Sequence, residues 1–141
     1  MRRTKVVALG VLVALAAAAA YAVKASAVAS RASNATVKVT MVEWKMTLSA
    51  PQATAGKVTF VVRNAGKKKH EFVVIRTNLA PNALLVTGGK ASEKGSQGEI
   101  EEFGAGLTKK LTLTLKPGKY VLICNLLRHY KRGQFAGFRV R

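Results

Sequence analysis

The chain has 141 residues, of which 49% are hydrophobic and 21% charged, so it is long enough and apolar enough for one domain with a packed core. Its 24 lysines and arginines outnumber 6 acidic residues, and the resulting net charge of +18 favours anionic partners without saying anything about the fold. One cysteine and two histidines exclude an internal disulfide, and also a multinuclear metal cluster held by histidines, within this chain.

Residues 1–27 have the pattern of an export signal. Arg2, Arg3 and Lys5 precede an apolar run from Val6 to Val23, and small residues of the A-x-A type follow. An uncleaved anchor is the alternative, because this run approaches the roughly 20 residues that span a bilayer. In both cases we expect the remainder of the chain to be exported to the periplasm or another extracytoplasmic space. Without residues 1–27 the net charge is still +14.

The rest of the chain is predicted to be a linker over residues 28–34 and one β-domain over residues 35–141. Apolar and polar residues alternate in short segments that turns rich in Gly and Pro separate. The predicted strands cover residues 36–49, 57–64, 70–77, 107–116, 120–124 and 135–140. Residues 78–106 have no clear period and are expected to form a long connection with a helical turn near residues 80–85. Six strands are thus assigned to residues and about seven to eight are expected in all, which predicts an all-β, antiparallel Greek-key sandwich.

The potential metal ligands fall at predicted strand ends. His70 opens a strand, Cys124 closes one, His129 lies in the following loop and Gln134 opens the last strand. Strand ends of a sandwich meet at its two ends, so these side chains can converge. A thiolate and two imidazoles with a weak fourth ligand are typical of a mononuclear copper site. An odd cysteine in an exported protein is kept for intermolecular bridging or for chemistry, and a bound metal would protect it from oxidation.

Four segments resemble the cupredoxins, the plastocyanin- and azurin-like blue copper proteins. They are "NAGKKKHEFVVIRT", "GEIEEFGAG", "PGKYVLICNLLRHYKRG" and "FAGFRV". The spacing from cysteine to histidine to axial residue is similar to that of the rusticyanin and sulfocyanin type. The resemblance covers roughly residues 35–141. It implies equatorial copper ligands at His70, Cys124 and His129, an axial ligand at Gln134, and transfer of single electrons without enzymatic bond chemistry.

The sequence departs from this family at three places. Gln134 replaces the usual axial methionine, as in stellacyanin, which implies a stronger axial bond and a lower reduction potential. Leu127 and Arg128 stand where relatives often have Pro-Gly, and they put a cation beside His129. Glu71 follows His70 where many blue copper proteins have asparagine.

Several alternatives remain open at this point. Zinc would suit a site with two histidines, a cysteine and an amide. Copper delivery or resistance is the alternative function, and a basic adhesion module without metal is a third. A buried core cysteine with structural histidines is the plainest interpretation of each residue alone. A Cys-His nucleophile pair would need an orienting group and an oxyanion site, and the sequence marks neither.

Residues around the predicted ligands have predicted supporting roles. We expect the Asn125 side chain to hydrogen-bond the His70 loop, with Glu71 also next to the ligands. Two cationic runs flank the histidines, and we expect them to dock an acidic redox protein or an anionic membrane surface by electrostatic steering. Nucleic acid is not an expected partner, and a monomer is expected. The cationic runs consist of Lys67, Lys68, Lys69, Arg128, Lys131 and Arg132.

Overall fold

The computed structural model describes residues 33–141. The predicted signal or anchor and most of the predicted linker lie outside these residues. Among the residues described, no helix is both long enough and apolar enough to cross a membrane. The first strand begins at Ser33, two residues before the predicted start of the domain.

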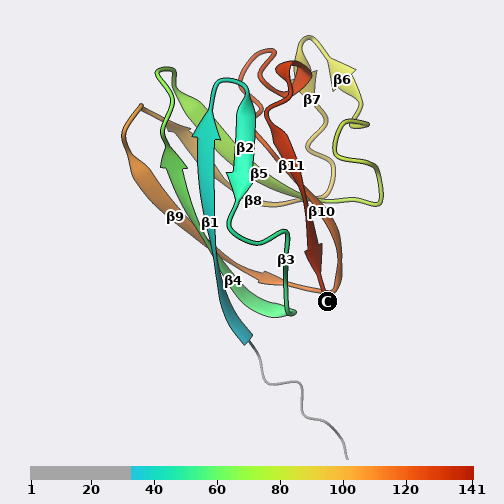
Figure 1. The fold of residues 1–141 in the computed structure, drawn as a ribbon. Coiled ribbons are helices and arrows are strands. Elements are labelled where there is room, and N and C mark those ends of the chain that lie inside the picture. The colour runs from blue at the N-terminus through green and yellow to red at the C-terminus, as the bar shows by residue number, and fades with distance from the viewer. Residues whose placement is uncertain (1–32) are drawn as a thin grey trace, which may run out of the picture.

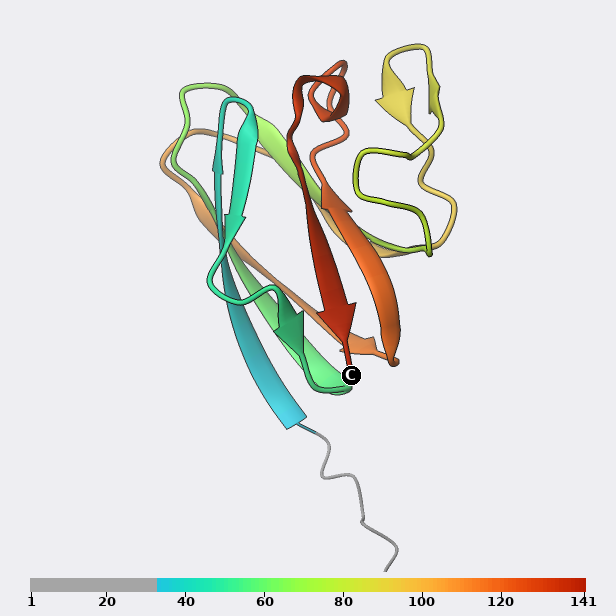
Figure 2. The same ribbon diagram turned by 45° about the vertical axis from the view of Figure 1, so that its right-hand side comes forward.

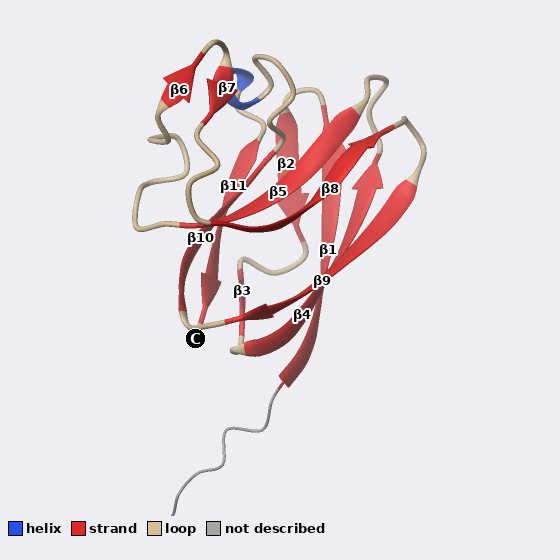
Figure 3. Ribbon diagram, turned by 180° about the vertical axis from the view of Figure 1, so that it is seen from behind, coloured by secondary structure: helices blue, strands red, loops and turns tan. Residues whose placement is uncertain are grey.

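The described chain folds into two β-sheets that face each other (Figure 1). The first sheet has the order β2 (Lys45–Leu48), β1 (Ser33–Val42), β4 (Gly56–Asn64) and β9 (Thr108–Leu115). The second has the order β3 (Gln52–Ala53), β11 (Phe135–Val140), β10 (Gly118–Ile123), β5 (His70–Arg76) and β8 (Ser96–Phe103). A short hairpin of β6 (Val86–Thr87) and β7 (Lys90–Ala91) and one 3₁₀ turn, η1 (Tyr130–Arg132), complete it. The view from behind shows how little helix the fold contains (Figure 3).

The predicted all-β sandwich is confirmed, although its sheets are mixed and not wholly antiparallel. β1 pairs in parallel with β4, and β11 pairs in parallel with β3. The chain reverses direction after β1 and again after β3, so β4 returns beside β1 in the same direction. Eight of the strands within residues 33–141 have four or more residues, in agreement with the predicted number.

The main core lies between the sheets, where the alternating apolar residues meet. Val58, Phe60 and Val62 of β4 are fully buried. The Phe60 ring packs against Phe72 of β5 and Phe138 of β11, with 5.4 Å between ring centroids in each pair. These contacts join the two sheets, and burial of such large apolar side chains is the main stabilising contribution in a fold of this size.

A second, smaller core covers the outer face of β5 and β10. Val73, Ile75, Val121 and Ile123 pack there under residues of the long connection and of the loop after β10. Figure 2 shows the β6–β7 hairpin beside this part of the sheet. β5 is therefore buried on both faces, which explains its continuous apolar run.

The helical turn predicted near residues 80–85 is wrong. The segment makes a β-turn in which the Ala83 N–H donates to the Ala80 carbonyl at 2.9 Å. The Leu84 N–H instead donates to the Tyr130 hydroxyl at 2.9 Å, and that hydroxyl donates to the Pro81 carbonyl at 2.8 Å. Tyr130 thus holds the connection in an extended course over the second core.

The sequence also missed β8, because only Ile100 and Phe103 of this edge strand are buried. A bulge in its pairing with β5 further removes the period-2 pattern.

Candidate metal centre

Strand pairing brings the predicted ligands to one end of the sandwich. His70 is the first residue of β5, and Cys124 follows the last residue of β10. Because β5 and β10 are antiparallel neighbours, the start of one lies beside the end of the other. Gln134 directly precedes β11, which pairs with β10. We call this end of the molecule the site end; it is the upper end in Figure 1.

The loop from Cys124 to Gln134, here called the ligand loop, is closed by its own backbone. The Cys124 N–H donates to the Gln134 carbonyl at 3.0 Å, and the His129 N–H donates to the Leu126 carbonyl at 2.9 Å. Gly133 ends η1 with φ of 104°, a backbone conformation that glycine adopts without steric cost. These bonds fix the positions of the side chains that the loop presents.

The side chains of His70, Cys124 and His129 converge. Their potential ligand atoms all lie within 4.8 Å of one another. Cys124 Sγ is 3.8 Å from His70 Nδ1 and 3.2 Å from His129 Nδ1. His70 and Cys124 are fully buried, whereas His129 is only half-buried. Two ring nitrogens and one sulfur with converging lone pairs fit a single metal ion.

Gln134 is buried next to the same cluster. Its Nε2 donates to the Val42 carbonyl at 2.9 Å and lies 3.4 Å from His70 Nε2. Its Oε1 is buried and has no hydrogen-bond partner. A buried amide oxygen without a partner costs about 1–3 kcal/mol. A metal ion bound by His70, Cys124 and His129 could provide this oxygen with a partner. The Gln134 side chain therefore fits as a fourth ligand of such an ion.

Burial controls the protonation of the three strong donors. It raises the pKa of the Cys124 thiol to about 11, although the N–H groups of Glu71 and Leu126 oppose the shift. The Glu71 N–H donates to Cys124 Sγ at 3.4 Å. Burial also lowers the pKa of His70 and of His129 below 6.5. Near neutral pH the centre therefore holds one thiol and two neutral imidazoles.

The hypothesis for the Asn125 side chain is wrong about its partner. Its Oδ1 accepts from the Ala91 N–H at 2.7 Å, and its Nδ2 donates to the Ala91 carbonyl and to Glu93. Asn125 follows a buried cysteine on an extended backbone, so its side chain points to the opposite face and reaches β7. Its backbone N–H, however, bonds the half-buried carboxyl group of Glu71, whose pKa is raised by burial.

Asn64 performs the cross-linking that was expected of Asn125. This fully buried residue ends β4, and its Nδ2 donates to the carbonyls of Lys68 and Phe103 at 2.8 and 3.2 Å. Its Oδ1 accepts from the Gly66 N–H at 3.0 Å. The loop before His70 is therefore anchored to β8 through one amide. A polar residue at the inward-facing end of a strand is the signal that could have identified it.

Sequence reasoning also missed the turn of residues 42–44, which consists of the last residue of β1 and the two residues before β2. Besides the Val42 carbonyl bonded to Gln134, the Glu43 carboxylate lies 3.3 Å from His70 Nε2. The Trp44 ring packs edge-on against His129, with 4.7 Å between centroids. Trp44 falls inside the predicted strand of residues 36–49, where the default role of an aromatic residue is packing in the core. The one available signal was that Glu43 is the only acidic residue among the first 70.

The two predicted cationic runs both lie at the site end. The charges of Arg132 and Lys68 each contribute to the lowered pKa of His129, so both groups act on that ring. The Arg132 guanidinium lies 4.5 Å from the centre of the Trp44 ring, while Lys69 pairs with Glu102 at 2.8 Å. One cation of each run therefore acts on the less buried histidine.

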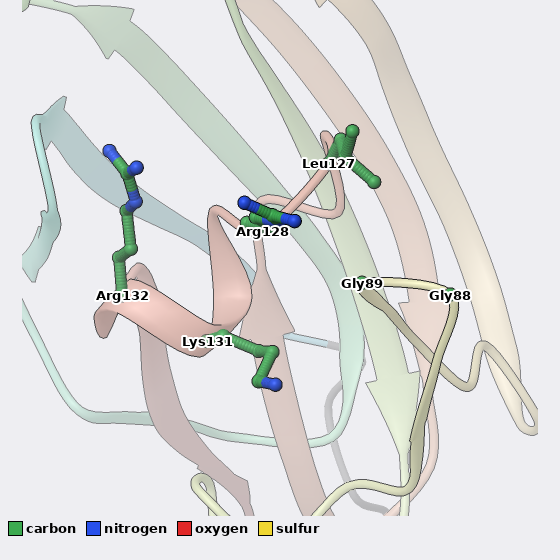
Figure 4. A pocket seen from close by; sticks show the side chains of 6 residues that line it. All are labelled: Gly88, Gly89, Leu127, Arg128, Lys131 and Arg132. Carbon is green, nitrogen blue, oxygen red and sulfur yellow. The ribbon is translucent and has the colours of Figure 1, made fainter.

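An open pocket of about 650 Å³ adjoins this cationic surface (Figure 4). Arg128, Lys131 and Arg132 line it, together with Leu127 and the turn at Gly88 and Gly89. Arg128 has a left-handed backbone with φ of 66°, and its N–H donates to the Gly89 carbonyl at 2.8 Å. A glycine at this position would adopt that conformation without strain.

A two-sheet sandwich that presents one thiol and two imidazoles at one end defines a mononuclear metal-binding β-protein. The model of the cupredoxin-like domain family matches residues 5–136. The chain therefore belongs to the cupredoxin-like family, as the resemblance of the four segments predicted.

Solved structures show the same fold at low sequence identity. Reduced auracyanin from Roseiflexus castenholzii has a TM-score of 0.57 and 17% identity, over 75% of this chain and 96% of that one. Rusticyanin from Thiobacillus ferrooxidans has 0.58 and 15%, over 77% of each chain. Auracyanin A, a blue copper protein from Chloroflexus aurantiacus, has 0.57 and 16%, over 77% and 100%. No curated protein matches the sequence.

Metal binding is expected to release one proton near neutral pH. Only the thiol must lose a proton, because its pKa is about 11 while both imidazoles are already neutral. Raising the pH removes the competing proton, so Zn²⁺ affinity should increase by about tenfold per pH unit between pH 7 and 9. Competition titrations with a chelator measure this slope. A slope near zero would show that the thiol is not a ligand.

Proposed function

We propose that the protein is a type 1 copper protein that carries single electrons and performs no bond chemistry of its own. The observation that carries the proposal is the convergence of one buried thiol and two imidazole nitrogens within 4.8 Å. His70, Cys124 and His129 would be the three strong ligands, and the partnerless Gln134 Oε1 would be the weak axial one. Such a site supplies a Cu(I)/Cu(II) couple.

Rigidity of the ligands supports electron transfer over delivery of the metal. The ligand loop is held by backbone hydrogen bonds, and Asn64 and Glu43 anchor the loop before His70. A donor set that cannot move exchanges oxidation states with little rearrangement. A delivery protein, by contrast, must open its site to release the ion, and two of the three strong donors here are fully buried.

Electrons would enter and leave through His129. It is the least buried of the three strong donors, and its ring contacts Trp44 at the cationic surface. An acidic redox protein is the proposed partner, because the positive charge at this end would orient it before contact. The export pattern of residues 1–27 supports a location outside the cytoplasmic membrane.

Copper binding has a spectroscopic test. The purified domain with Cu²⁺ should show an intense visible thiolate-to-copper charge-transfer band, and Cys124→Ser should abolish it. Reversible voltammetry of the blue protein would then support a carrier, whereas release of copper on reduction would favour delivery. Absence of the band together with tight Zn²⁺ binding would overturn the proposal.

The axial role of Gln134 can be tested separately. Gln134→Met should raise the reduction potential, because a thioether stabilises Cu(II) less than an amide oxygen does. Gln134→Leu, which provides no donor, is the matched comparison and should raise it further. Voltammetry of the three proteins gives the order directly. Equal potentials would show that the Gln134 oxygen does not bind the ion.

Partner docking predicts a specific salt dependence. Replacing Arg128, Lys131 and Arg132 by Gln should slow electron transfer to an anionic partner roughly tenfold at low ionic strength and flatten its salt dependence. The control replaces three exposed cations at the opposite end of the sandwich, namely Lys57, Lys119 and Arg139. Stopped-flow rates that fall equally in both variants would indicate an effect of net charge alone, not of this surface.

A further inference from the structure

The structure places a carboxylate beside His70 that the proposed function uses only as an anchor of the preceding loop. Glu43 lies in the turn between β1 and β2, and 22% of its side chain is exposed. Its Oε1 accepts hydrogen bonds from the backbone N–H groups of Lys67 at 2.9 Å and Lys68 at 2.7 Å. The same Oε1 lies 3.3 Å from His70 Nε2. One carboxylate thus connects three positions of the loop that ends in a predicted ligand.

We propose that Glu43 is a positioning residue for His70: it fixes the tautomer and orientation of the imidazole and favours the more positive oxidation state of the bound ion. This proposal rests on the proposed function for its redox part. The claim about the tautomer and orientation of the His70 imidazole depends only on contacts between protein atoms.

The tautomer follows from the position of the Glu43 carboxylate, 3.3 Å from His70 Nε2. A carboxylate can only accept, so the proton of the neutral His70 ring belongs on Nε2. The Nδ1 lone pair is then free, and Nδ1 is the atom that lies 3.8 Å from Cys124 Sγ. A carboxylate that holds the distal nitrogen of a metal-binding histidine is a recurrent way to orient the ring and increase its basicity.

Gln134 does not compete for this proton. Its Nε2 lies 3.4 Å from His70 Nε2 and donates to the Val42 carbonyl at 2.9 Å, and an amide NH₂ group can only donate, so it cannot accept the His70 proton. The amide orientation is thereby set, because a carbonyl requires a donor. Glu43 is therefore the acceptor for His70.

The carboxylate of Glu43 is held in its charged form. Its Oε1 accepts from two backbone N–H groups, those of Lys67 and Lys68, and such donors favour the ionised carboxylate. A fixed negative charge beside one ligand stabilises Cu(II) more than Cu(I), because the interaction grows with the charge of the ion. Glu43 should therefore lower the reduction potential and strengthen binding of divalent ions.

Two substitutions separate charge from position. Glu43→Gln keeps an acceptor of the same length but removes the charge, and Glu43→Ala removes both. Glu101→Gln removes an equal charge from an exposed position of β8 and is the matched control. Melting of the metal-free proteins by circular dichroism verifies that each variant is folded.

We expect Glu43→Gln to weaken Cu(II) binding relative to Cu(I) roughly tenfold, within the range for partners of metal-binding histidines. For one electron this corresponds to a rise in potential of about 59 mV. Zn²⁺ affinity should fall by a similar factor, and Glu101→Gln should change neither quantity. If potential and Zn²⁺ affinity in Glu43→Gln and Glu43→Ala equal those of the control, the redox part of the proposal is wrong.

The tautomer is tested without metal, so its outcome does not depend on the proposed copper chemistry. In ¹⁵N-labelled apoprotein at pH 7.5, we expect the His70 ring to show a protonated Nε2 and a bare Nδ1. Glu43→Ala should shift this ring toward a mixture of tautomers. A wild-type ring protonated on Nδ1, or a ring unaffected by Glu43→Ala, would overturn the positioning role even if the protein proves to be blue.

Discussion

The Cys124 thiol, buried between two imidazole nitrogens, is the constraint on which the rest of the site end depends. A sulfur atom 3.2 and 3.8 Å from two Nδ1 atoms is held there by the Glu71 N–H and by the surrounding core. The same burial keeps the thiol protonated without metal, since the pKa is about 11. The sandwich therefore builds a site whose strongest donor becomes a thiolate only when an ion displaces its proton.

Two segments of the chain hold these side chains in place from opposite sides. The ligand loop carries Cys124, His129 and Gln134 on a backbone closed by internal hydrogen bonds. The turn of residues 42–44 lies across from it and contacts His70, His129 and Gln134 through a carboxylate, a ring and a carbonyl. The first is a short local segment, whereas the second comes from the opposite sheet. The centre is thus a product of packing between the two sheets as much as of ligand spacing.

The difference between a local segment and a contact from the opposite sheet explains which residues of the site could be predicted from the sequence. Periodicity identified most strands, and the faces of β4 and β9 follow from alternation, with Val58, Phe60 and Leu115 buried. Soft donors are rare in this chain, so His70, Cys124 and His129 were found from residue type and position. Glu43, Trp44 and Asn64 were not, because their contacts with His70, His129 and Phe103 join residues far apart in the sequence and their types are common in strands and turns. β8 was missed because an exposed edge strand has little apolar alternation to detect.

At Arg128 the charge of the surface and the stability of the fold make opposite demands on the residue. A large side chain with φ of 66° carries a steric penalty of about 1–2 kcal/mol that glycine avoids. Evolution toward heat tolerance alone would favour glycine at this site, and would thereby remove one cation from the pocket beside His129. Arg128 therefore adds charge to this surface at the expense of folding stability. The backbone angle of a single residue thus sets the stability of the loop against the charge that the loop presents.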